Sequence, residues 1–194
     1  MPNWCFNRIR IRCPDNDMAE DLYNKLTEWT SFNYRDSDFS LSWLGNVVGN
    51  SGIDAYEGRD FTKYSCRGSL DEFTIDENEI TVFTSTAWSP MIQMWKGVCD
   101  KYFPEAEILY DSEECCNGIY QTNDKELVGK YYLDSGEDEL ESDMDYSEQE
   151  LIKTFQEYFK SKEDTLEYYE KLIEEDELYI GIHKWEYVSI EDCE

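Results

Sequence analysis

The sequence predicts an α+β protein in which helices pack against an antiparallel sheet. Residues 4–12 alternate between apolar and polar side chains, which is the period of a strand with one buried face. Helical stripes alternate with further β-like segments in the rest of the chain. Of the 194 residues, 40% are hydrophobic and 15% are aromatic, so the chain has enough apolar material to build a folded core.

The expected elements follow one another along the first two thirds of the chain. In order they are a strand over 4–12, a helix over 18–29, a short buried helix over 41–49, strands over 62–68, 70–76 and 79–86, a helix that starts at 89–90, and strands over 106–112, 117–122 and 128–134. Two helix starts have recognisable signals. Asp15 or Asp17 can cap the first helix, and Ser89 is expected to cap the third, with Pro90 as its first residue.

An acidic run at 136–150 precedes a long helical stripe. Ser147 and Glu150 have the spacing of a capping box, in which each residue satisfies a backbone N–H of the other. The apolar stripe continues to residue 176, either as one helix or as two helices joined near Ser161.

The order of elements predicts the domain organisation. Strand, helix, strands, helix and strand is the pattern of a ferredoxin-like sandwich, which we expect over residues 1–135. Residues 136–194 are expected to form an acidic helical extension, and its last part, 178–190, alternates like a returning strand.

The charge of the chain is its most informative bulk property. There are 45 acidic and 17 basic residues, which gives a net charge of −28. Residues 1–110 hold 18 acids and 10 bases, whereas residues 111–194 hold 27 acids and 7 bases. A small domain needs a net charge of only about 2–8 to stay in solution. The excess repels phosphate, argues against direct binding of nucleic acid, and favours a basic partner.

The acidic excess suggests imitation of a nucleic acid. Duplex DNA carries about one charge per ~1.7 Å of its axis, so twenty net charges correspond to roughly 34 Å of duplex. Carboxylates that share one face would replace the phosphates. The expected partner-binding acids are Glu113, Glu114, Glu137, Asp138, Glu139, Glu141, Asp143 and Asp145.

Residue patterns for catalysis or metal binding are missing from the sequence. The seven cysteines contain no C-x-x-C pair, so we interpret them as reduced, mostly buried thiols of a cytosolic protein. His183 is the only histidine, and no nucleophile motif accompanies it. We therefore expect no enzyme activity, no cofactor and no metal. No apolar window of membrane-spanning length and no signal peptide are found, so no membrane association is expected.

Two stretches of sequence carry a family resemblance. The opening MPNWCFN and the stretch FTSTAWSP at 83–90, which leads into a helix, together resemble the YubB-type (Api-like) ferredoxin-like domain of phages, plasmids and other mobile elements. The resemblance covers residues 1–135 and implies the fold and a mobile-element source, but no settled activity. Some members of the family carry a tryptophan-rich Gly-Thr-Lys motif, which the corresponding region SCRGSLDEF lacks.

Three residues within the resembling stretches have two interpretations. Trp4, Asn7 and Trp88 could line a pocket on the sheet. Alternatively, the two tryptophans pack in the core, and the Asn7 amide satisfies backbone groups at the edge of a strand. The residue types and their spacing favour the second interpretation.

Three functions remain open on the sequence alone. The first is a nucleic-acid mimic from a mobile element that inhibits a host defence nuclease, such as a CRISPR effector or a restriction enzyme, in the host cytoplasm. The second is a ligand-binding domain or an enzyme of unknown substrate, with the pocket on the ferredoxin-like sheet. The third is an interaction module whose helical segment at 147–176 docks in a groove of a partner.

Overall fold

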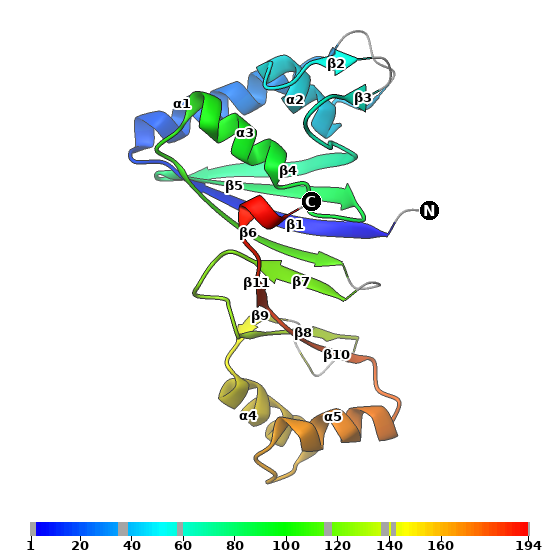
Figure 1. Cartoon of the computed structure of the whole chain (residues 1–194). Helices are drawn as coiled ribbons and strands as arrows, with labels where there is room; N and C mark the ends of the chain where they lie inside the picture. Colours follow the sequence, from blue (N-terminus) through cyan, green and yellow to red (C-terminus); the bar gives the residue numbers. More distant parts are fainter. Residues whose placement is uncertain are drawn as a thin grey trace. The chain divides into compact units, whose positions relative to one another are not determined.

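The computed structural model describes residues 3–34, 39–57, 60–114, 118–136, 140 and 143–193. The chain forms two compact units (Figure 1), which are described separately. Unit 1 contains Met1–Asn123 and Val188–Glu194, and unit 2 contains Asp124–Tyr187. The sequence predicts a domain boundary at 135/136, and the two compact units divide between Asn123 and Asp124. The final residues belong to unit 1 because Val188 donates its N–H to the Thr122 carbonyl at 3.0 Å.

Unit 1 is a sheet covered by helices. Its elements are β1 (Trp4–Arg12), α1 (Asn16–Trp29), α2 (Leu44–Ser51), β2 (Tyr56–Glu57), β3 (Asp60–Phe61), β4 (Gly68–Asp76), β5 (Glu79–Ala87), α3 (Gln93–Tyr102), β6 (Glu107–Glu114), β7 (Ile119–Thr122) and the 3-10 turn η2 (Ile190–Asp192). The main strands lie in the order β7-β6-β1-β5-β4, and each neighbouring pair is antiparallel. Figure 1 shows α1, α2 and α3 on the same side of this sheet. The coarser expectation, a mixed fold in which helices pack on a sheet, is confirmed.

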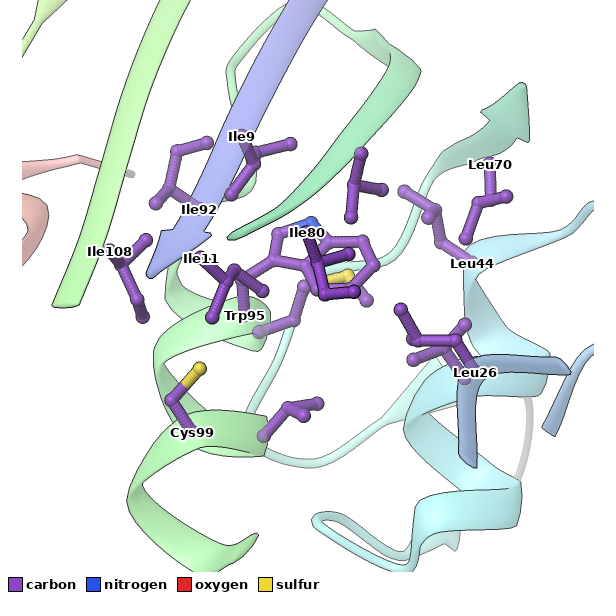
Figure 2. Close-up of a cluster of buried hydrophobic side chains, with 14 of the residues drawn as sticks. Ile9, Ile11, Leu26, Leu44, Leu70, Ile80, Ile92, Trp95, Cys99 and Ile108 are labelled. Carbon is purple, nitrogen blue, oxygen red and sulfur yellow. The ribbon is translucent and has the colours of Figure 1, made fainter. Parts of the chain in front are cut away.

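The core of unit 1 lies between the sheet and these helices. Ile9 and Ile11 of β1 and Ile80 of β5 are fully buried, and so are Leu26 of α1 and Leu44 of α2. Figure 2 shows these side chains gathered around the indole of Trp95 from α3. The alternation of residues 4–12 has the expected cause, because every second side chain of β1 points into this core.

Two expected elements of unit 1 differ from the structure. Residues 62–67 form an irregular segment rather than a strand, because Asp54 accepts hydrogen bonds from Thr62 Oγ1 at 2.6 Å and from the Tyr64 N–H at 3.0 Å. The helix expected to begin at Ser89-Pro90 begins at Gln93 instead. The chain takes left-handed backbone angles at Trp88 (φ 68°) and at Met91 (φ 53°), and these turns delay the start of α3.

Unit 2 is a small α/β unit with a core of its own. Its elements are β8 (Tyr131–Ser135), β9 (Asp143–Tyr146), α4 (Glu148–Phe159), α5 (Leu166–Glu175), β10 (Ile180–Lys184) and β11 (Glu186–Tyr187). Its three-stranded sheet has the order β10-β8-β9. A cluster of buried side chains joins the sheet to the helices; it consists of Leu133, Leu140, Leu151, Phe155, Leu166, Tyr169 and Ile173. The C-terminal part of the chain is therefore not only helical.

The helical stripe of unit 2 is divided into two helices. The capping box at the start of α4 is confirmed, because the Ser147 N–H donates to Glu150 at 2.9 Å and the Glu150 N–H donates back to Ser147 Oγ at 3.3 Å. Helix α4 ends at Lys160, whose φ of 51° is left-handed. Of the two alternatives that the sequence left open, the structure shows the second, in which two helices are joined near Ser161.

None of the helices within the described ranges is long and apolar enough to cross a membrane.

Candidate functional site

The carboxylates around α5 share the solvent-facing side of that helix. The buried residues Leu166, Tyr169 and Ile173 form one stripe that faces the core of unit 2. The acidic residues of the segment are all exposed; they are Glu163, Asp164, Glu167, Glu170, Glu174, Glu175, Asp176 and Glu177. We call these eight residues the α5 acidic face. The spacing that buries the apolar stripe directs the four acids of the helix itself outward, and the other four lie in the segments that precede and follow it.

Few bases neutralise the α5 acidic face. Lys171 pairs with Glu167 at 2.6 Å, one turn earlier on the helix. This contact raises the pKa of Lys171 and lowers the pKa of Glu167, through the hydrogen bond between them. Lys162 is the other base of the segment, and it lies before α5. Most of the carboxylates of this face are therefore available to a partner.

The C-terminal end of α5 has the hydrogen bonds of a Schellman motif. The Leu178 N–H donates to the Ile173 carbonyl at 3.1 Å, and the Glu177 N–H donates to the Glu174 carbonyl at 3.3 Å. The motif requires a left-handed residue, and Glu177 takes that conformation with a φ of 52°. Glycine usually occupies this position because it has no Cβ to strain the backbone. Here the position carries a carboxylate instead.

A groove lies beside this helix end, within unit 2. Its volume is about 600 Å³, and we call it the Tyr179 groove. Its lining residues come from the end of β8, the end of α5 and the start of β10; they are Asp134, Ser135, Gly136, Ile173, Glu174, Glu177, Leu178, Tyr179, Ile180 and Gly181. Among the described residues, the lining contains three carboxylates, several apolar side chains and no basic residue. Tyr179 is 84% exposed.

A second groove of unit 2 has a different charge balance. It is about 360 Å³ in volume and is lined by Lys130, Asp145, Tyr146, Glu150, Lys153, Thr154 and Glu157. We call it the Lys153 groove. Its Lys130 pairs with Asp145 at 3.3 Å. Since two lysines stand among its three carboxylates, this groove is largely neutralised by the chain itself.

The acids expected from the sequence are placed unevenly. Glu114 is 1% exposed, so it is removed from the expected acidic surface. Glu113 is partly buried, with its Oε2 atom shielded from solvent. Asp145 is exposed but paired with a lysine. Asp143 lies on β9, and its side chain is outside the described part of the structure, as are Glu137, Asp138, Glu139 and Glu141.

The three residues of the expected pocket differ in burial. Asn7 is 3% exposed, and its Nδ2 donates to Thr86 Oγ1 at 2.9 Å and to the Thr84 carbonyl at 3.2 Å. The Asn7 amide therefore satisfies polar groups between β1 and β5, which agrees with the second of the two interpretations given above for this residue. Trp4 is 47% exposed and Trp88 is 51% exposed, so neither indole is a core anchor. The Arg67 guanidinium lies 6.0 Å from the Trp88 ring.

Burial shifts the pKa values of two thiols and of the single histidine. Burial raises the pKa of the Cys5 thiol to about 12, and it does the same for Cys99, so neither is a thiolate at neutral pH. Burial lowers the pKa of His183, and the nearby Asp134 opposes this shift. Within the described residues, no group of three or more His, Cys, Asp or Glu side chains is arranged to hold a metal ion.

No protein-family model matches the chain, and neither the curated proteins nor the solved structures contain a match to it. The function must therefore be argued from the residues of the chain itself.

The α5 acidic face and the Tyr179 groove were not singled out in the sequence. The signal for the acidic face was present, because the acids occupy the positions between the apolar residues of the stripe. The groove had no comparable signal. It depends on how the end of α5 meets β8 and β10, and residues more than thirty positions apart in the chain contribute to it.

Proposed function

We propose that this protein binds a basic surface of a partner protein and that the α5 acidic face makes the contact. The observation that carries the proposal is the concentration of eight exposed acids within residues 163–177, four of them on the ten-residue helix α5. At ~1.5 Å per residue the helix is about 15 Å long. The same length of duplex DNA carries roughly nine phosphate charges. The helix itself carries four acids and one lysine, and the other four acids extend the negative surface beyond its two ends. The segment is thus a concentrated negative surface, although its charge density is lower than that of a nucleic-acid backbone.

The partner that fits this surface is a basic nucleic-acid-binding protein. Arg and Lys side chains that bind phosphates also pair with carboxylates. The proposed role is that of a mobile-element inhibitor that occupies the nucleic-acid channel of a host defence nuclease, such as a CRISPR effector or a restriction enzyme, in the host cytoplasm. The mobile-element source follows from the resemblance of MPNWCFN and FTSTAWSP to the YubB-type family.

We also infer that unit 1 has a ferredoxin-like arrangement. Its elements β1, α1, β4, β5, α3 and β6 follow the order of a βαββαβ unit. The strands lie in the spatial order β6-β1-β5-β4, so the first and third strands of that unit are central neighbours. Helix α2 and the short strands β2 and β3 are additions between α1 and β4.

The test compares two variants of equal charge. In the first, Glu170, Glu174 and Glu175 of α5 are replaced by Gln; in the second, Glu20, Glu28 and Glu105 of unit 1, which are also exposed, are replaced by Gln. Purified CRISPR effectors and restriction enzymes are assayed for DNA cleavage with each protein over a range of salt concentrations. Exposed ion pairs are worth about 0.2–1 kcal/mol each, so the first variant should inhibit roughly tenfold less well.

Three results would contradict this proposal. If both variants lose the same amount of inhibition, net charge, and not the α5 acidic face, is responsible for inhibition. Inhibition that does not weaken with rising salt would exclude an electrostatic contact of this kind. Failure of the wild-type chain to inhibit any enzyme of the panel would count against the choice of partner.

A second candidate function is ligand binding on unit 1. Trp4, Phe6 and Trp88 are each about half exposed, and the φ of Trp88 is left-handed, a strained conformation of the kind that clusters at functional sites. Replacement of Trp88 by Ala, which leaves the α5 acidic face unchanged, separates the two candidates. If the Trp88→Ala protein is folded but no longer inhibits the nuclease, the ligand-binding function of unit 1 is favoured.

A further inference from the structure

We propose that the Tyr179 groove binds an arginine side chain of the partner. The inference rests on the proposed function, because it takes from it the basic partner, and it adds the place where one side chain of that partner is anchored. The groove lies at the end of the α5 acidic face and shares Glu174 and Glu177 with it.

The lining of the groove matches the two parts of an arginine side chain. Ile173, Leu178 and Ile180 supply apolar surface, against which the aliphatic stem of an arginine can pack. The carboxylates of Asp134, Glu174 and Glu177 supply acceptors for the charged head. A volume of about 600 Å³ is within the range of sites that hold small ligands.

Three features of the groove attract positive charge. The carboxylates of Asp134, Glu174 and Glu177 make no ion pair in the described part of the structure. The carbonyl groups at the C-terminal end of α5 carry the negative end of the helix dipole, and the last turn contains no basic residue. The ring of Tyr179 offers a face on which a guanidinium can stack. Each feature favours a cation. A planar guanidinium can pair with the carboxylates, lie at the negative end of the helix dipole and stack on the ring.

Two comparisons narrow the choice of occupant. The Lys153 groove is built on the same unit, but its two lysines occupy the place of an incoming cation. The Tyr179 groove is poorly suited to a metal ion. Among the described residues, no three or more His, Cys, Asp or Glu side chains are arranged to hold a metal, and this includes the acids of the groove. An organic cation with an aliphatic stem is the ligand that the lining fits.

The experiment is an NMR titration of the whole ¹⁵N-labelled chain with short blocked peptides. The probes are acetyl-Gly-Arg-Gly-amide, the same peptide with lysine, and the same peptide with citrulline, which has nearly the shape of arginine without the charge. The arginine peptide should shift the amide signals of Gly136, Tyr179 and Gly181 in a saturable way. The citrulline peptide should bind roughly tenfold more weakly, since it lacks the charge-assisted contacts.

Matched variants show whether the named residues are responsible. The double substitution Glu174→Gln and Glu177→Gln should weaken binding of the arginine peptide roughly tenfold, whereas Glu157→Gln in the Lys153 groove should leave it unchanged. Tyr179→Leu should weaken binding, and Tyr187→Leu, at another exposed tyrosine, should not. The amide spectrum of each variant reports whether unit 2 is still folded.

Several results would overturn the inference. Equal affinity for the citrulline peptide would show that charge plays no part, and equal affinity for a lysine peptide would overturn the assignment to arginine. Shifts confined to the Lys153 groove would place the site elsewhere. The two proposals also fail separately. A chain that binds the arginine peptide but inhibits no nuclease disproves the proposed function alone, and a chain that inhibits without binding the peptide disproves this inference alone.

Discussion

Replacement of Glu177 by glycine should stabilise unit 2 and weaken its binding of a cation. Glu177 holds the left-handed position of the Schellman motif with a φ of 52°. A residue with a Cβ costs about 1–2 kcal/mol in this conformation. Glycine removes that strain, but it loses about 0.5–1 kcal/mol more chain entropy on folding than alanine does. The net expectation for Glu177→Gly is a gain of about 0.5–1 kcal/mol in the free energy of unfolding.

The assay is thermal unfolding of the whole chain, with hydrogen exchange at the Leu178 amide as the local probe. For a unit of 60–100 residues, 1 kcal/mol shifts Tm by about 4–8 °C. The expected rise for unit 2, Asp124–Tyr187, is therefore roughly 2–8 °C. Because the Leu178 N–H bonds to the Ile173 carbonyl across the motif, its exchange should slow down in the variant.

Two further variants separate strain from charge. Glu177→Gln removes the carboxylate but keeps the Cβ, so it should weaken binding of the arginine peptide without the full gain in stability. Lys160→Gly relieves the same kind of strain at the end of α4, where φ is 51°, but lies outside the Tyr179 groove. It should stabilise unit 2 and leave peptide binding unchanged. A Glu177→Gly protein that is less stable than the wild type would refute the reasoning.

Three other outcomes are expected. Phe155→Ala should destabilise unit 2 by about 3–5 kcal/mol, because Phe155 is fully buried in the core of that unit; urea unfolding measures this loss, and hydrogen exchange shows whether unit 1 stays folded. The pKa of His183 is lowered by burial in the folded state, so the stability that its neutral form contributes is complete above about pH 6.5 and is lost as the pH falls through the folded pKa. Urea midpoints at pH 7.5 and 5.5 should therefore differ more in the wild type than in His183→Gln. With a pKa of about 12, Cys5 should resist iodoacetamide at pH 8 until the chain is unfolded, and peptide mapping by mass spectrometry detects the modification.

The sequence predicted those elements whose pattern is local. The alternation in β1 arises because one side of the strand faces the helices, and the capping box of α4 is set by Ser147 and Glu150 alone. Residues 62–67 were wrongly expected in a strand, since their conformation depends on hydrogen bonds to Asp54, eight or more positions away. No local pattern distinguishes such a segment from a strand.

Trp88 shows a second limit of the sequence. Its residue type and its place before a helix favour burial, but its backbone has a left-handed φ of 68° and its side chain is 51% exposed. The path of the chain between β5 and α3 decides this conformation, and hydrogen bonds such as that from the Trp88 N–H to the Asn3 carbonyl, at 2.9 Å, fix it. The acids of α5 were predictable as a solvent face, but the groove at its end required the fold.

The C-terminal end of α5 concentrates negative charge where the helix dipole disfavours it. Helix α4 has Glu148 and Glu150 in its first turn, where the dipole favours acids, and Lys160 as the residue that caps its C-terminal end. Helix α3 has Lys101 in its last turn. Helix α5 has Glu167 in its first turn, but acidic residues alone follow Ile173 up to position 177, at the negative end of the dipole. Each of these carboxylates lowers the stability of the helix end, and a bound cation would reverse that effect. The acids at the end of α5 therefore reduce stability at the location where the proposed partner would restore it.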